Sequence, residues 1–216
     1  MRDGTDSVLH PPASASRAEG LPAGQRARRR TILDTARELL DDRPFEAVQM
    51  REVGKSAGVA LGTLYRYFPS KEQLYAEVLG EWIITHLAAA PTSVDGAAGR
   101  LQWKIDVVTA AYASHPRFAA AQRRILLSES PSVKVPLEDG QSASLAWLVE
   151  ELSILEGPRA DELARILLAV LNAIVERMTV AGEPEVMARR MGETFVGLVA
   201  SELQEAEVLA AGGARR

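Results

Sequence analysis

The feature that most constrains the fold is a helical spacing of apolar residues that runs through nearly the whole chain between residues 26 and 206. In the segment 28–41, for example, apolar residues recur at intervals of three and four, which places them on one face of a helix. The alternation of apolar and polar residues that is typical of strands is absent. Pairs of glycine and proline, as at residues 157–158, interrupt the spacing and indicate where one helix ends and the next begins. The sequence therefore predicts an all-α protein of about nine helices.

The breaks in this spacing predict two helical domains between two irregular ends. Three N-terminal helices are expected at about 28–41, 50–57 and 61–67, and a long fourth helix at about 71–89, with Ser70 as its predicted cap. Five more are expected at about 98–114, 117–128, 137–155, 159–181 and 185–206. We expect a helix-turn-helix domain over 26–69 and a larger helical domain over 70–206. Residues 1–25, rich in Pro, Ala, Ser and Gly, are expected to form a disordered arm, and residues 207–216 a flexible tail.

Charge is distributed unevenly along the 216 residues, although the net charge is only −4. Residues 26–71 contain ten Lys and Arg against six Asp and Glu, whereas residues 72–216 contain thirteen against twenty. Such a basic segment favours a nucleic-acid partner even in an acidic chain. The absence of cysteine excludes disulfides and thiolate sites. No apolar run approaches the roughly 18 to 20 residues of a membrane-spanning helix, and residues 1–25 do not resemble a secretory signal. We therefore expect a cytoplasmic protein with no membrane partner.

The two short helices around Gly58 have the spacing of a helix-turn-helix. Val53, Ala57, Val59, Leu64 and Phe68 are expected to form the small core that sets their angle. The outward face of the pair then presents Arg51, Leu61, Gly62, Thr63, Tyr65, Arg66 and Tyr67. Small, hydroxyl-bearing and cationic groups suit the major groove of DNA, where a guanidinium can donate two hydrogen bonds to guanine. The alternative is a helical hairpin with exposed tyrosines and ordinary surface charge.

The string AGVALGTLYRYFPSKEQL, residues 57–74, resembles the DNA-binding domain of TetR-family transcriptional repressors, within a similarity of about fifty residues. The resemblance implies a homodimer that binds a palindromic double-stranded DNA operator and that a small-molecule effector releases. It also implies DNA contacts at the positions that match the family's usual ones, namely Gln49, Arg51, Thr63, Tyr65, Tyr67 and Lys71. The sequence departs from the family's pattern around residues 48–49, at Gly54 and at Ala60, which weakens two helix caps and one helix.

A cluster of arginines precedes the helix-turn-helix. Arg28, Arg29 and Arg30 have two interpretations: an arm that holds phosphates or enters the minor groove, or a solvated helix start. The helix dipole disfavours cations at a helix start, so we expect phosphate contact, with Arg28 among the contacts.

The larger domain offers candidates for an effector pocket. Its scattered aromatic residues could line an apolar cavity or belong to an ordinary core. Polar residues that interrupt an apolar helix could orient a ligand, pair across an interface or form an internal hydrogen bond. The candidate pocket residues are Trp82, Trp103, Val107, Phe118, Trp147, Asn172 and Arg177. The stretch VQMREVGKSAGVALGTLYRYFPSK is similar to repressors of sterol and lipid catabolism in actinobacteria, which implies a lipid-like or acyl-CoA-like effector.

Two wide apolar stripes on the last two helices indicate a dimer, because one antiparallel helix pair would not bury both. The candidate interface residues are Leu167, Leu171, Ile174, Met178, Met191, Phe195 and Leu198. The alternative is that both stripes are buried within one subunit.

Nothing in the sequence favours an enzyme. The three histidines, His10, His86 and His115, are far apart in sequence without a second ligand at a metal spacing, and no phosphate-binding loop or serine elbow occurs. We expect no metal and no cofactor. The function expected is that of a sequence-specific DNA-binding transcriptional regulator, a homodimeric repressor with an apolar effector. The alternatives are an activator or partner-controlled regulator of the same fold, and a helical interaction module without DNA function.

Overall fold

The computed structural model describes residues 20–86, 93–155 and 157–213. In these residues the chain forms nine α-helices and one short 3-10 helix, and no strand. The N-terminal elements are α2 (Ala23–Asp42), η1 (Phe45–Ala47), α3 (Met50–Ser56) and α4 (Leu61–Tyr67). The later helices are α5 (Lys71–His86), α6 (Gly96–Ser114), α7 (Pro116–Leu126), α8 (Pro131–Leu152), α9 (Arg159–Val180) and α10 (Glu185–Gly213). The all-α fold predicted from the helical spacing is confirmed.

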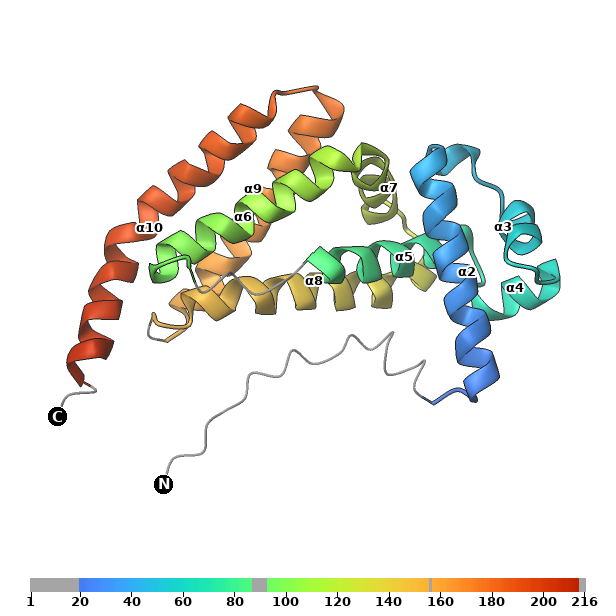
Figure 1. Ribbon diagram of the computed structural model, residues 1–216, viewed down its shortest axis with the longest axis horizontal. Coiled ribbons are helices and arrows are strands. Elements are labelled where there is room, and N and C mark those ends of the chain that lie inside the picture. The colour runs from blue at the N-terminus through green and yellow to red at the C-terminus, as the bar shows by residue number, and fades with distance from the viewer. Residues whose placement is uncertain (1–19, 87–92, 156, 214–216) are drawn as a thin grey trace.

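The helices form a small N-terminal group and a larger bundle. Figure 1 shows α2, α3 and α4 together at one end of the molecule, with α5 leading from them into the bundle, where it lies along α8. On the other side of the bundle α10 packs along α6. Helix α7 reaches back from the bundle to contact α2 and η1. The N-terminal group is thus attached to the bundle through α5 and α7.

The N-terminal group has its own apolar core, to which each helix contributes. Ile32 of α2, Val53 of α3 and Leu64 of α4 have no exposed surface, and Phe68 directly after α4 is equally buried. Gly58, between α3 and α4, has a φ of 67°, a conformation that residues with a side chain rarely adopt. The predicted turn at Gly58 and the predicted burial of Val53, Leu64 and Phe68 are therefore confirmed, whereas Ala57 and Val59 are half-buried.

Helix α5 is fixed to the N-terminal group at its start. The Ser70 Oγ accepts a hydrogen bond of 3.0 Å from the Gln73 N–H, which is the cap predicted from the sequence. The Tyr75 hydroxyl donates to the carbonyl of Ala36 in α2 at 3.0 Å, and the Tyr75 ring meets the ring of Phe45 edge-on. A movement of α5 therefore moves α2 unless these buried contacts break.

Glycines allow two close helix crossings in the bundle. A Cβ at Gly192 of α10 would lie 2.6 Å from the side chain of Ile105 in α6, so only glycine permits this approach. Helices α5 and α8 approach each other at Gly80 and Gly140, where a Cβ on Gly140 would lie 4.0 Å from the Gly80 Cα. The absence of two side chains at that crossing leaves space beside it.

Three helix boundaries differ from the prediction by five residues or more. Helix α2 begins at Ala23, inside the expected arm, because the Pro22 carbonyl accepts the N–H groups of Gln25 and Arg26 and starts the first turn. Helix α8 begins at Pro131 and continues through the buried Pro136, since a proline near a helix start removes few hydrogen bonds. Helix α10 continues to Gly213, so the expected tail is helical over 207–213. The Glu207 carboxylate accepts a hydrogen bond of 2.6 Å from the Ala97 N–H, which holds this segment to the start of α6.

Candidate DNA-binding surface and effector pocket

One face of α4 is left open to solvent because the opposite face carries the buried Leu64. Of the predicted contact residues, Leu61, Gly62, Tyr65 and Arg66 are exposed, and Thr63 and Tyr67 are half-buried. Leu61 and Tyr65, four positions apart on this face, have 40% and 45% of their surface exposed. Large apolar side chains grouped in solvent are typical of a surface that a partner covers.

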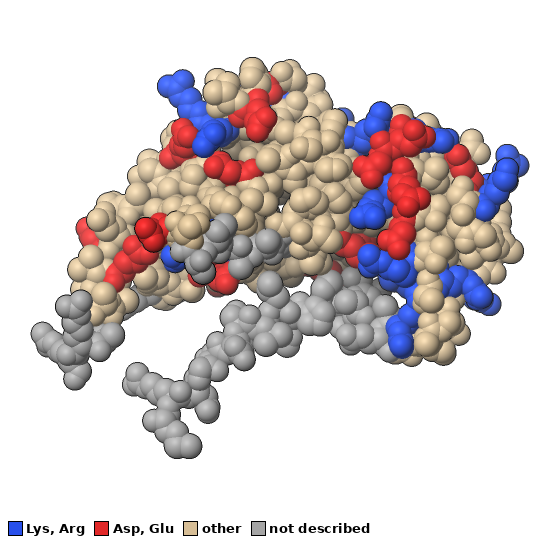
Figure 2. All heavy atoms as spheres, viewed as in Figure 1, with Lys and Arg blue, Asp and Glu red and all other residues tan. Residues whose placement is uncertain are grey.

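Unpaired cations lie beside this face. Arg51 and Lys55 of α3 and Arg66 of α4 are exposed, and no ion pair joins them to any residue that the structure describes. Arg43, by contrast, lies 2.7 Å from the Glu52 carboxylate and also pairs with Asp42, and both contacts raise its pKa. Figure 2 shows Lys and Arg side chains over the end of the molecule that holds α2 to α4, together with acidic groups. The available positive charge therefore borders the open face of α4.

Two of the predicted contact residues lie at the margin of the surface. Gln49 is exposed directly before α3, and its side chain makes no capping hydrogen bond, as the weakened cap in the sequence predicted. The Lys71 ammonium lies 4.2 Å from the centre of the Phe45 ring and 3.5 Å from the Glu46 carbonyl oxygen. Partial burial lowers the pKa of Lys71. Lys71 is thus turned toward η1, and it must rotate to reach a phosphate.

The arginine cluster lies within α2 rather than before the first helix. Arg29 forms an ion pair with Glu77 of α5, and its guanidinium lies 5.3 Å from the centre of the Phe68 ring. Arg30 pairs with Glu81 of α5 at 3.3 Å. Arg28 is exposed. Two arginines of the cluster thus join α2 to α5, and Arg28 stays a predicted DNA contact.

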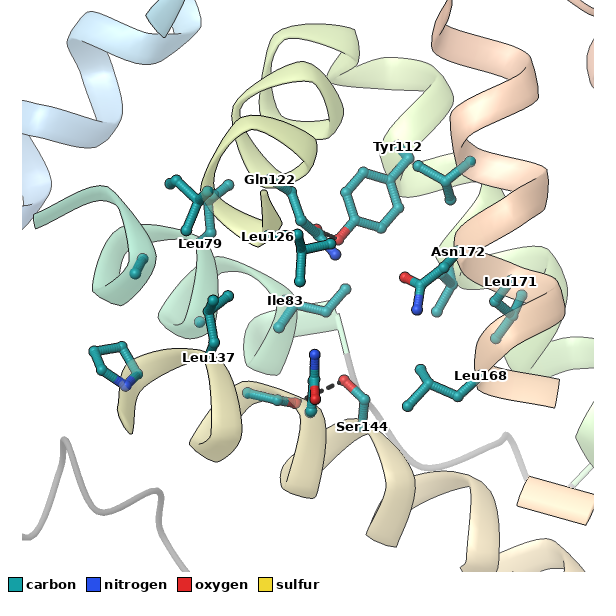
Figure 3. Close-up of a pocket in the computed structure, with 18 of the residues that line it drawn as sticks. Leu79, Ile83, Tyr112, Gln122, Leu126, Leu137, Ser144, Leu168, Leu171 and Asn172 are labelled. Atoms are coloured by element: carbon teal, nitrogen blue, oxygen red, sulfur yellow. Dashed lines mark hydrogen bonds between the residues drawn. The ribbon is translucent and has the colours of Figure 1, made fainter. Parts of the chain in front are cut away.

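A pocket lies in the bundle, with walls from α5, α6, α7, α8 and α9. Most of its wall is apolar. Figure 3 shows the Asn172 amide and the Ser144 hydroxyl directed into the space, near Ile83, Leu126 and Leu168. The cavity volume is about 90 Å³. The pocket is therefore narrow, and Gly80 and Gly140 form part of its wall.

Two of the seven predicted pocket residues line this pocket, Trp147 and Asn172. Trp82 and Phe118 pack against each other outside it, with ring centroids 4.9 Å apart. Arg177, at the end of α9, forms an exposed ion pair with Glu183. Val107 and Trp103 face elsewhere on α6, where Val108 lines the pocket instead. A shift of one residue turns a helical side chain by about 100°, so periodicity alone did not select the lining residues.

Tyr112, one of the scattered aromatic residues that the sequence offered for a cavity, also lines the pocket, as do polar residues with no such signal. Tyr112 donates a hydrogen bond to the Gln122 side chain, and Ser144 donates to the Gly140 carbonyl at 2.9 Å. Burial raises the pKa of the Tyr112 hydroxyl, which therefore stays neutral. Gly80 has no side chain, so it could have been recognised as a pocket residue only if the position of α8 were known.

The residues predicted for a dimer interface divide into two groups. Leu167, Leu171, Ile174 and Phe195 are buried within the subunit, so the alternative of burial in one subunit describes them correctly. Met178 and Met191 are half-buried, and Leu198 has 77% of its surface exposed. The large apolar side chains that α9, α10 and the turn between them leave exposed are Ile166, Val180, Val186, Met187, Leu198, Val208 and Leu209. Of the predicted interface residues, Leu198 is therefore the one that lies fully on this open apolar face.

The histidines are closer than their sequence positions suggested. The rings of His86 and His115 lie 6.3 Å apart, and both pack against Trp82. His10 lies outside the described residues. Over the described part of the chain, no group of three or more His, Asp or Glu side chains could hold a metal ion. None of the helices described is both long and apolar enough to span a lipid bilayer.

Comparisons with known proteins place these features in a family. Residues 32–78 match the sequence model of the bacterial regulatory proteins of the tetR family. The HTH-type transcriptional repressor KstR of Mycobacterium tuberculosis is 37% identical over 131 residues, 59% of this chain but only 56% of the repressor's length. The HTH-type transcriptional regulator EthR of the same species is 29% identical over 212 residues, covering 85% of this chain and 93% of that protein.

The fold is shared over nearly the whole length of a solved structure. A TetR transcriptional regulator from Rhodococcus sp. RHA1 superposes with a TM-score of 0.67 at 24% identity, covering 84% of this chain and 99% of the other. The residues that match the family's model include all of α3 and α4, whose open face has just been described. The helix-turn-helix, the fold and the relatives of this chain together support a TetR-family transcriptional regulator.

Proposed function

We propose that this protein is a homodimeric repressor that binds a palindromic DNA operator through α4 and leaves it when an apolar effector occupies the bundle pocket. It acts in the cytoplasm, where bacterial DNA lies. The observation that carries the DNA-binding part is the open face of α4, where exposed Leu61 and Tyr65 lie beside cations that have no acidic partner in the described chain. Apolar atoms contact thymine methyl groups, and guanidinium groups contact guanine or phosphate.

Binding-site selection from random DNA tests this proposal directly, because a dimer should recover an inverted repeat. Tyr65→Ala and Arg51→Ala are each expected to weaken binding to the selected site by about 5- to 150-fold, and binding to unrelated DNA much less. Arg123→Ala, which removes an exposed arginine on α7, is the matched control and should change neither. Equal losses on both DNAs would mean that Tyr65 and Arg51 only hold phosphates.

The dimer is supported by the apolar side chains that α9 and α10 leave exposed. Ile166 and Leu198 have 51% and 77% of their surfaces in solvent. Two copies that join these faces would bury them in a four-helix contact and would present two α4 helices to one operator. Leu198→Arg should therefore produce a monomer in sedimentation and lower operator affinity. Leu127→Arg changes an equally exposed leucine at the end of α7, and it should leave the dimer intact.

Release by an effector is supported by the two faces of α5. Ala76, Leu79, Gly80 and Ile83 line the pocket, whereas Glu77 on another face of the same helix pairs with Arg29 of α2. An occupant that favours a different position of α5 shifts the population toward the spacing of α4 helices that does not fit the operator. A saturating pocket ligand that leaves operator affinity unchanged would refute this mechanism, and would favour the activator or partner-controlled regulator of the same fold.

The helical interaction module without DNA function remains the contrasting proposal. The full chain should bind the selected DNA with an affinity that falls steeply as salt rises. A full chain that binds no selected DNA above the background of random sequences would establish the contrasting proposal instead.

A further inference from the structure

We propose that the bundle pocket binds an uncharged, mainly apolar molecule that carries a hydroxyl, ketone or ester group, and that it rejects the carboxylate and coenzyme A forms of the same skeleton. The proposal rests on the proposed function in one respect, the role of this pocket as the effector site. Ligand binding can nevertheless be measured on the protein without DNA, so the two proposals fail separately.

The wall of the pocket carries no charge. Its lining residues, all within the described chain, include no Lys, Arg, His, Asp or Glu. Tyr112 is the ionisable group among them, and burial raises the pKa of its hydroxyl. A carboxylate that enters such a wall loses its water without meeting a cation, and this desolvation is strongly unfavourable. A neutral ligand of the same length does not meet this barrier.

The buried cation nearest the pocket is already committed to protein partners. Lys104 of α6 is fully buried behind Trp147, and its ammonium lies 4.9 Å from the centre of the Trp147 ring. The Lys104 ammonium donates to the Trp147 carbonyl and lies 3.0 Å from Glu150 and 3.1 Å from Glu151. Two acidic groups therefore surround this one ammonium, and Arg100 pairs with Glu151 as well. Lys104 cannot turn to a ligand without breaking its contacts with the Trp147 carbonyl, Glu150 and Glu151.

The polar side chains of the pocket wall are all neutral: Tyr112, Gln122, Gln141, Ser144 and Asn172. The Asn172 amide offers a donor and an acceptor, and the Ser144 oxygen, while donating to Gly140, keeps lone pairs that can accept. One or two such groups in an apolar wall orient a ligand through a single hydroxyl, ketone or ester. The narrowness of the space favours a slender or flat skeleton over a globular one.

A series of probes with one ten-carbon chain tests the assignment: decanol, methyl decanoate, decanoate and decanoyl coenzyme A. Binding is measured by calorimetry on the full-length protein, and by its thermal shift. Decanol and methyl decanoate should bind. At about pH 7.5 decanoate should bind roughly 1,000-fold more weakly than decanol, because only about one molecule in a thousand is protonated. The affinity for decanoate should rise about tenfold for each unit by which the pH is lowered, whereas the affinity for decanol should not change.

Filling the pocket shows where the probes bind. A side chain at Gly80 meets no atom within 4 Å, so Gly80→Leu projects into the space and should abolish decanol binding. Gly212→Leu adds the same group on the surface of α10 and should have no effect. Ser144→Leu fills the pocket from α8 and serves if Gly80→Leu does not fold.

The outcomes separate cleanly. The proposal is overturned if decanol does not bind, if decanoate or decanoyl coenzyme A binds as tightly as decanol, or if both filling variants still bind decanol. Decanol binding that Gly80→Leu removes supports the ligand class, even if the operator is not released. In that last case the effector-released repressor fails while the ligand class stands.

Discussion

Removal of Arg29 from α2 is expected to lower the stability of the fold, whereas removal of its neighbour Arg28 is expected to weaken DNA binding. Arg29 and Glu77 have only 13% and 6% of their side-chain surfaces exposed. Arg29→Ala leaves a buried carboxylate without its cation, which costs about 3–5 kcal/mol where burial is complete. Because Arg29 is partly exposed and the Gln73 amide lies 3.5 Å from Glu77, we expect about 3 kcal/mol.

Thermal unfolding at one fixed protein concentration measures this loss. For a chain of this length about 3 kcal/mol corresponds to a fall of roughly 6–12 °C in Tm. The double variant Arg29→Met, Glu77→Met should recover most of the fall, since replacing both charges by apolar groups leaves neither buried alone. Arg28→Ala should change Tm little, because an exposed residue contributes within about 0.5 kcal/mol.

DNA binding should show the reverse pattern. Arg28→Ala is expected to reduce the slope of log affinity against log salt by about 1, the signature of one lost phosphate contact. Below its melting temperature Arg29→Ala should keep the wild-type slope. The reasoning is refuted if Arg29→Ala melts with the wild type, or if Arg28→Ala leaves the salt slope unchanged.

Two further predictions concern stability. Gly192→Ala should destabilise the protein by about 1–3 kcal/mol because its Cβ collides with Ile105, whereas Gly197→Ala on the same helix meets no atom and should stabilise by up to about 1 kcal/mol; urea unfolding of both variants compares them. Stability should fall above about pH 10, since burial raises the pKa values of Tyr75 and Tyr112, so the folded chain keeps protons that the unfolded chain loses. Each of the two tyrosines should lower the free energy of unfolding by about 1.4 kcal/mol for each pH unit in this range, and Tyr75→Phe should remove the part of the loss that comes from Tyr75. A slope unchanged in Tyr75→Phe would contradict this assignment.

What the sequence predicts well is what depends on neighbours along the chain. The turn at Gly58 and the Ser70 cap each arise within a few residues, and the structure confirms both. The bounds of α4 are those expected, because apolar spacing and a following Pro69 define them locally.

What it predicts poorly depends on contacts between distant segments. Arg29 looked like a DNA contact because its partner, Glu77, belongs to another helix. The pocket is built by five helices, so the rotation of each decides whether Val107 or Val108 faces it. The inward direction of Leu167 likewise follows from the packing of α9 on the bundle, which no periodicity specifies.

The continuity of α5 has a mechanical consequence. Its 16 residues make a rod about 24 Å long, held near one end by the Tyr75 hydroxyl and resting against α8 at Gly80. A tilt of roughly 5° about its middle displaces each end by about 1 Å, and in a two-fold dimer the displacements of the two copies add. Gly80 of α5 and Gly140 of α8 present no side chains to each other at the crossing, so the contact resists a tilt little, whereas the helix itself is stiff. Under the proposed release mechanism, a small molecule beside Gly80 therefore needs only a slight tilt of α5 to move the end that contacts α2.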